Sequence, residues 1–237
     1  MKTAFLFHFW PYAAAVLFGV GILIRFAATR RSVAATVDPR ALLRRAKLLL
    51  FSLLLLVLGH AAGLFFPRLI LQWNGLPSRL YALEALAFAI GLSALFACTV
   101  AMWRHLSSSD GSIGTLADTA FLSMLFIALL SGSLTAALYR WGSSWGAVTL
   151  APYTSSLLHG KPIIGLANGM PFLVRLHIFS AFATLALSPA TPAASVLVVA
   201  LRRSLRWTST PVYRFANLGK VVARRLNPAI WIWPELE

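Results

Sequence analysis

The chain has 237 residues, of which 59% are apolar and only 11% are charged, and its mean hydropathy is +0.79. A soluble domain has about a quarter charged residues, so a water-soluble globule is excluded and the chain must face lipid. One cysteine excludes a disulfide framework, a thiolate zinc site and a cysteine-ligated iron–sulfur cluster within the chain. The net charge is +15, but the basic residues follow the ends of apolar stretches, which argues against nucleic acid as a partner.

Five apolar stretches are each long enough to form a helix that crosses about 30 Å of hydrocarbon. They cover residues 5–26, 47–66, 81–103, 118–139 and 171–201. The first is longer than the apolar part of a signal peptide and ends at arginines, so we expect it to be retained. The sequence therefore predicts an all-α integral membrane protein. Residues 1–203 form a bundle of five transmembrane helices, and residues 204–237 form a basic, aromatic tail.

Basic side chains are divided unequally between the two sides of the membrane. They follow the first and third spans and fill the tail, whereas the other side carries only Lys2, Arg68, Arg79, Arg140 and Lys161. The positive-inside rule then places the N-terminus outside and the C-terminal tail in the cytoplasm. The tail interleaves aromatic side chains with its arginines. Two interpretations of it stay open, which are contact with anionic lipid and docking of a cytoplasmic partner protein.

Two of the five histidines lie within predicted spans, where an ionisable side chain is costly and indicates function. His60 precedes the end of the second span by six residues and His177 follows the start of the fifth by six, so both lie about 9 Å inside one boundary. Two neutral imidazoles at one depth on different helices suit the axial positions of a haem iron. Gly59 and Gly63 would let the macrocycle pack closely against the helix, and Arg175 would pair with a propionate.

An alternative is that each histidine only makes a hydrogen bond between helices, in a cofactor-free anchoring or assembly subunit. A transporter is a third class, but broken spans or inverted repeats are not seen apart from Pro189 and Pro192. His8 and His105 lie at span ends, where a solvated imidazole needs no functional explanation. His159 lies in the long loop at 140–170 and is either a quinone contact or an ordinary loop residue.

At these residues the chain resembles the gamma subunit of respiratory nitrate reductases, a five-helix cytochrome b that passes electrons between quinol and a cytoplasmic iron–sulfur subunit. The matching segments are WPYAAAVLFGVGILIRF in the first span, LGHAAG followed by Pro67 in the second, LHG in the loop, FLVRLH followed by Pro189 in the fifth, and TPVYRF in the tail. In that family two stacked haems are each held by one histidine from the second span and one from the fifth. His60 and His177 match the outer pair, whereas Leu50 and Ser195 stand at the inner positions. We therefore expect one b-type haem with His60 and His177 as its iron ligands.

The resemblance implies an electron-transfer subunit of an oxidoreductase rather than the catalytic subunit, in the inner (cytoplasmic) membrane of a prokaryote. Its expected partners are iron–sulfur and molybdenum-type catalytic subunits, lipid and quinone. The family's quinol site lies at the outer start of the third span, where Arg79, Tyr81 and Glu84 are the candidates here, with His159 from the loop. The terminal substrate stays open among nitrate, another oxyanion and a sulfur compound. About 20 Å of hydrocarbon would separate this haem from the inner surface. Three explanations stay open. A second redox centre or a quinone bridges that gap, or the electrons leave toward an outer partner, or the subunit is largely a membrane anchor.

Overall fold

The computed structural model describes residues 5–31, 46–107, 113–139 and 142–191, together with Ala194 and Val198. The predicted tail at 204–237 lies outside the described residues. Within the unit formed by residues 1–195, every described element is helical, and five helices are long and apolar enough to cross a membrane. The prediction of an all-helical protein with five spans is confirmed, and its sidedness stays a prediction.

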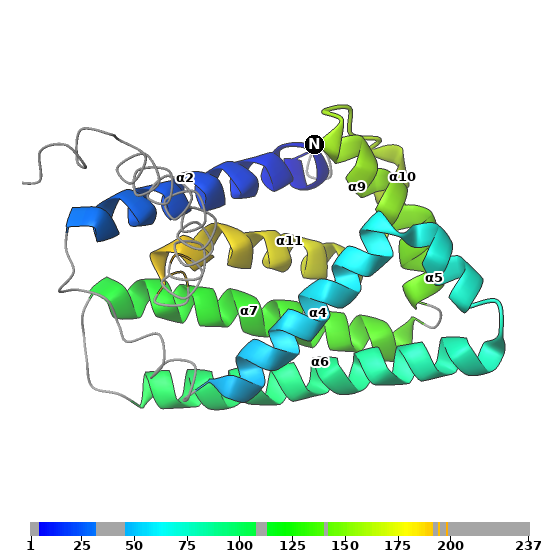
Figure 1. The fold of residues 1–237 in the computed structure, drawn as a ribbon, viewed down its shortest axis with the longest axis horizontal. Helices are drawn as coiled ribbons and strands as arrows, with labels where there is room; N and C mark the ends of the chain where they lie inside the picture. Colours follow the sequence, from blue (N-terminus) through cyan, green and yellow to red (C-terminus); the bar gives the residue numbers. More distant parts are fainter. Residues whose placement is uncertain are drawn as a thin grey trace, which may run out of the picture. The chain divides into compact units, whose positions relative to one another are not determined.

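The five spanning helices form one bundle. They are α2 (Trp10–Arg31), preceded by the π-helical turn η1 (Phe5–Phe9), α4 (Lys47–Phe65), α6 (Pro77–Leu106), α7 (Ile113–Leu138), and α11 (Phe172–Leu187), followed by the 3₁₀ turn η3 (Ser188–Ala190). Helix α2 packs closely on α11, α11 on α7, α7 on α6, and α6 on α4. The two helices α4 and α11 are not closely packed on each other. Figure 1 shows α4 running obliquely to the other four helices.

Prolines set the ends of several helices. A short helix, α5 (Pro67–Trp73), and the spanning helix α6 both begin at a proline, whose missing N–H has no intrahelical acceptor in the first turn. The third span therefore starts at Pro77, four residues before the predicted start. Pro189 cannot donate a helical hydrogen bond, and the regular part of the fifth span ends two residues earlier. The remainder of the predicted fifth span falls largely outside the described residues.

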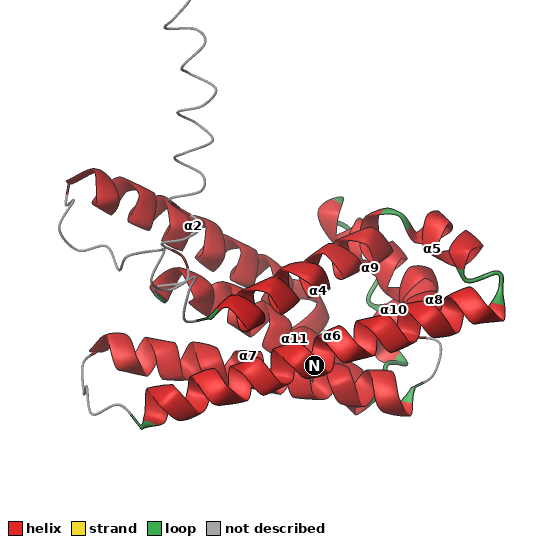
Figure 2. Ribbon diagram, turned by 60° about the horizontal axis from the view of Figure 1, so that its bottom comes forward, coloured by secondary structure: helices red, strands yellow, loops and turns green. Residues whose placement is uncertain are grey.

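The connection between α7 and α11, predicted as a loop, is mostly helical. It contains α8 (Gly142–Trp145), the π-helical turn η2 (Gly146–Leu150), α9 (Ala151–Leu158) and α10 (Gly165–Asn168). We call residues 142–170 the cap segment, the end of the bundle that they cover the cap end, and the opposite end the far end. Figures 1 and 2 both show α5, α9 and α10 gathered at the cap end.

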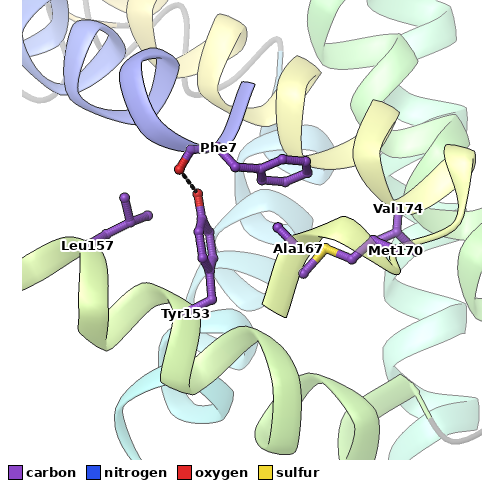
Figure 3. Packing of buried hydrophobic residues seen from close by; sticks show 6 residues of the cluster. All are labelled: Phe7, Tyr153, Leu157, Ala167, Met170 and Val174. Atoms are coloured by element: carbon purple, nitrogen blue, oxygen red, sulfur yellow. Dashed lines mark hydrogen bonds between the residues drawn. The ribbon is translucent and has the colours of Figure 1, made fainter. Parts of the chain in front are cut away.

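A buried cluster fixes the cap segment to the start of the bundle. It consists of Phe7, Tyr153, Leu157, Ala167, Met170 and Val174 (Figure 3). The Tyr153 hydroxyl donates to the Phe7 carbonyl at 2.7 Å, and the Tyr12 hydroxyl donates to the Leu157 carbonyl at 2.8 Å. Burial, with a smaller contribution from Tyr12, raises the pKa of Tyr153, so its hydroxyl stays a donor over a wide pH range.

A second buried cluster closes the far half of the bundle. We call it the far core, and it consists of Leu49, Ala94, Cys98, Leu125 and Leu129, from α4, α6 and α7. Ala94 and Cys98 are fully buried and lie one turn apart on α6. Such small side chains let neighbouring helices approach closely, which is the main source of packing attraction between helices in lipid.

Candidate haem site

The imidazole rings of His60 and His177 face one another across the cap half of the bundle. Their ring centres lie 6.0 Å apart, and the two ring planes are inclined by 32°. His60 comes from the last part of α4 and His177 from the first part of α11, two antiparallel helices that are not closely packed on each other. The equal depth expected for the two histidines thus brings their side chains together in space.

Both rings are held through the same nitrogen. The Nδ1 of His60 bonds to the Leu56 carbonyl of its own helix at 2.7 Å, and the Nδ1 of His177 bonds to the Ala128 carbonyl of α7 at 2.8 Å. A carbonyl oxygen can only accept, so each Nδ1 carries a proton, and each ring in its neutral form has a free electron pair on Nε2. Histidines that bind a metal are held in this way, with the second nitrogen donating to a carbonyl or a carboxylate.

The surroundings of the two rings differ. His60 is exposed, and a Cβ built on Gly59 or Gly63 beside it meets no atom within 4 Å beyond its own stretch of helix. His177 lies partly buried against Gly132 of α7, where a Cβ would come within 2.8 Å of its Cε1 atom. The sequence analysis missed Gly132, because nothing in the sequence indicates which side chain faces that glycine.

Arg175 carries an unsatisfied donor on the same helix as His177. It lies two residues before His177 on α11, and its Nε is buried without a hydrogen-bond partner among the described residues. A buried N–H donor without an acceptor is costly, which favours an accepting group such as a carboxylate beside it.

These features fit a haem bound by two histidines. Metal–imidazole bonds are about 2 Å long, so two rings bound along one axis of an iron have centres about 6 Å apart. The observed spacing agrees with this requirement. A haem could also use the two free Nε2 atoms, the open surface at Gly59 and Gly63, and the unpartnered Nε of Arg175. Among the described residues, no group of three His, Cys, Asp or Glu side chains could hold a separate metal ion.

Comparison with known families agrees with this geometry. The sequence model described as nitrate reductase gamma subunit matches residues 3–212, which is most of the chain. The chain belongs to the nitrate reductase gamma subunit family. No individual curated protein matched it. Membership makes it a multi-pass membrane protein of the cytochrome b subunit type, which associates with the catalytic and iron–sulfur subunits of nitrate reductase.

The four residues predicted for a quinone site in this family member make their described contacts with separate partners. Arg79 lies over the ring of Trp73 at 5.4 Å, and Tyr81 is exposed. The Glu84 carboxylate accepts hydrogen bonds from the Ser143 backbone N–H and hydroxyl, at 2.8 and 2.6 Å, so it ties α6 to the start of α8. The fourth residue, His159, bonds through Nδ1 to the Ser155 carbonyl at 2.7 Å.

The LHG segment that contains His159 also ends a helix. Gly160 has a φ of 71° and donates to the Leu157 carbonyl, and the N–H of Lys161 donates to Ser156. This is the Schellman arrangement, in which a glycine takes the left-handed conformation just after the last turn. The glycine in this segment therefore has a structural reason that is independent of any ligand.

The two remaining histidines lie apart from the pair. His8 stacks on the adjacent Phe9, with ring centres 4.8 Å apart. His105, at the end of α6, makes a 2.8 Å hydrogen bond between Nε2 and the Thr119 hydroxyl, and interacts electrostatically with Asp118. These contacts account for both rings without a cofactor.

Proposed function

We propose that this gamma-family chain is the membrane cytochrome b subunit of a quinone-linked, nitrate-reductase-like complex, and that it holds one b-type haem between His60 and His177. The observation that carries the proposal is the facing pair of imidazoles, 6.0 Å apart, with both Nδ1 atoms engaged. In this function the chain moves electrons between quinone and its partner redox subunits and leaves the substrate chemistry to them.

The haem, when bound, supplies reversible one-electron chemistry without an open iron position for substrate. The chain's own residues bind and orient it. The carbonyls of Leu56 and Ala128 fix the tautomer and the orientation of the two imidazoles, and the Arg175 guanidinium offers a charged donor to a propionate. Gly59 and Gly63 keep the surface of α4 open beside His60.

The proposed number of haems follows from the residues at the inner ligand positions, in the far half of the bundle. The family's inner ligand positions carry Leu50, an aliphatic residue, and Ser195, which lies outside the described residues. Among the described spanning helices, the far half has no histidine except His105, whose ring is bonded to Thr119. With one haem near the cap end, electrons cross the rest of the membrane through a quinone or another redox centre, or they pass directly to a partner at the cap end.

We place quinone exchange at the cap end, with Arg79, Tyr81, Glu84 and His159 as candidate contacts. Glu84 is the only acidic residue within its span, and it is the candidate acceptor of quinol protons. The proposed orientation puts the cap end outside a prokaryotic inner membrane and the basic tail in the cytoplasm. There the tail docks the iron–sulfur and molybdenum-type catalytic subunits.

A haem count tests the proposal directly. The chain is purified in detergent from cells supplied with haem precursor, and a pyridine haemochrome assay gives haem b per polypeptide. We expect a value near one. A value near two contradicts the single-haem assignment, and a value near zero in a folded chain favours the haem-free anchor.

A further inference from the structure

Gly132 leaves just enough room for the His177 ring against α7. A Cβ at this position would lie 2.8 Å from Cε1 and 2.9 Å from Nδ1 of His177, closer than real Cβ contacts come. The obstacle is a ring on a helix that packs closely against α7, so the contact cannot be relieved by a flexible chain end. Any side chain at 132 must displace the His177 imidazole.

The same glycine also exposes the carbonyl that this imidazole uses. Ala128 precedes Gly132 by four residues, and on an α-helix the side chain four residues later lies beside the carbonyl oxygen. With no Cβ at 132, His177 Nδ1 reaches the Ala128 carbonyl at 2.8 Å from the neighbouring helix. The Ser131 hydroxyl donates to the Ile127 carbonyl at 2.6 Å and more weakly to the Ala128 carbonyl at 3.2 Å, so the Ala128 oxygen accepts from both Ser131 and His177.

Among the described residues, no other helix gives His60 a hydrogen bond comparable to that of His177. Its Nδ1 bonds to Leu56, one turn earlier on α4, and its ring is exposed. The two imidazoles are therefore held differently, His60 by its own helix and His177 by a third helix that contributes no histidine to the pair.

We propose that Gly132 and the Ala128 carbonyl form a seat on α7 that fixes the ring plane and the tautomer of His177, which makes Gly132 a positioning residue for the haem. This inference rests on the proposed function. The Nδ1–H donation makes the imidazole a stronger electron donor through Nε2, and the narrow slot limits rotation of the ring. Helix α7 thus tunes a cofactor to which it gives no ligand.

The decisive variant is Gly132→Ala, with Gly91→Ala as its matched control. Gly91 is also a glycine within a spanning helix, and a Cβ there meets only the Ser133 hydroxyl at an ordinary 3.5 Å. We expect Gly132→Ala to weaken haem retention about ten- to a hundredfold, as loss of a second hydrogen-bonded shell does. The remaining haem should show shifted low-spin g-values in electron paramagnetic resonance and a higher midpoint potential. Gly91→Ala should match the wild type in all three measurements.

The proposed positioning role of Gly132 would be contradicted if a folded Gly132→Ala protein showed wild-type g-values, midpoint potential and haem retention. Circular dichroism and size-exclusion chromatography in detergent establish whether each variant folds.

A second measurement keeps the inference testable if Gly132→Ala does not fold. In the haem-free wild-type chain labelled with ¹⁵N-histidine, His177 should be a neutral ring protonated at Nδ1, with its signals assigned by their loss in His177→Gln. Protonation at Nε2 instead would overturn the seat. This spectrum needs no haem, so a wild-type chain that never binds haem contradicts the proposed function, whereas the tautomer decides the seat separately.

Discussion

The two halves of the bundle are built from the same helices in different ways. In the far half, α4, α6 and α7 meet through the far core, where aliphatic and small side chains fill the space between them. In the cap half, α4 and α11 are not closely packed on each other but bring two imidazoles to within 6.0 Å, and polar groups cross between elements at His177, Glu84 and Tyr153. The far half therefore joins three spanning helices by apolar packing, whereas the cap half combines its own buried cluster around Phe7 and Tyr153 with polar contacts and the proposed haem ligands.

The largest effect should come from the histidine pair. His60→Ala and His177→Ala should each abolish the low-spin b-type signal in a reduced-minus-oxidised spectrum, because each removes one of the two proposed iron ligands. His8→Ala, whose ring stacks on Phe9, should keep the signal. A normal spectrum in both ligand variants would show that the cap half does not hold the cofactor through these rings.

The converse substitution is Leu125→Ala in the far core. Leu125 is 5% exposed, and truncation of a buried leucine to alanine costs about 2–5 kcal/mol through lost contacts and a residual cavity. Unfolding in detergent mixtures should show this loss, while the haem content of the folded fraction stays near the wild-type value. A large loss of haem from folded protein would break the separation between the two halves.

Two substitutions of Glu84 distinguish its role in holding α8 to α6 from its proposed role in taking up quinol protons. Glu84→Ala removes the acceptor for the Ser143 N–H and hydroxyl, at a cost of about 1.5 kcal/mol, and should raise amide hydrogen exchange at α8 roughly tenfold. Glu84→Gln keeps an accepting oxygen and should leave exchange near the wild type. Reduction of the haem by a quinol analogue should slow in both variants, because neither side chain takes up a proton. A wild-type rate in Glu84→Gln would remove Glu84 from the quinone site.

The smallest effect is expected at Tyr153. Tyr153→Phe removes the hydrogen bond to the Phe7 carbonyl and should destabilise the chain by about 1 kcal/mol. Because the folded pKa is raised, the stability that this phenol contributes is fully present below its ordinary pKa of about 10 and is lost as pH rises through the folded value. The difference in stability between variant and wild type should therefore be constant from pH 6 to about 9 in thermal unfolding. A difference that varies across this range would contradict the buried donor.

Hydropathy predicted the spanning helices because a chain in lipid must satisfy its backbone hydrogen bonds within each span. Depth along those helices was enough to pair His60 with His177, since rise per residue is fixed. The helices of the cap segment were missed because their apolar residues are interrupted by glycine and serine. Gly132 could not be predicted from the sequence, because its importance depends on contact with the His177 ring on α11, a helix that begins 40 residues later in the chain.

The first spanning helix finds its packing partners late in the sequence. Trp10 Nε1 donates to the Phe179 carbonyl and its ring stacks on that of Phe179, and a Cβ at Gly21 would lie 2.5 Å from the Cβ of Pro189. Within the part of the chain that the structure describes, α11 is the only other spanning helix that packs closely against α2. During synthesis, α2 is therefore made well before the helix that it packs against, and it gains this neighbour only when the fifth span has been made. A chain cut short before α11 would leave the α2 surface that meets Phe179 and Pro189 facing lipid, without the neighbour that it has in the complete bundle.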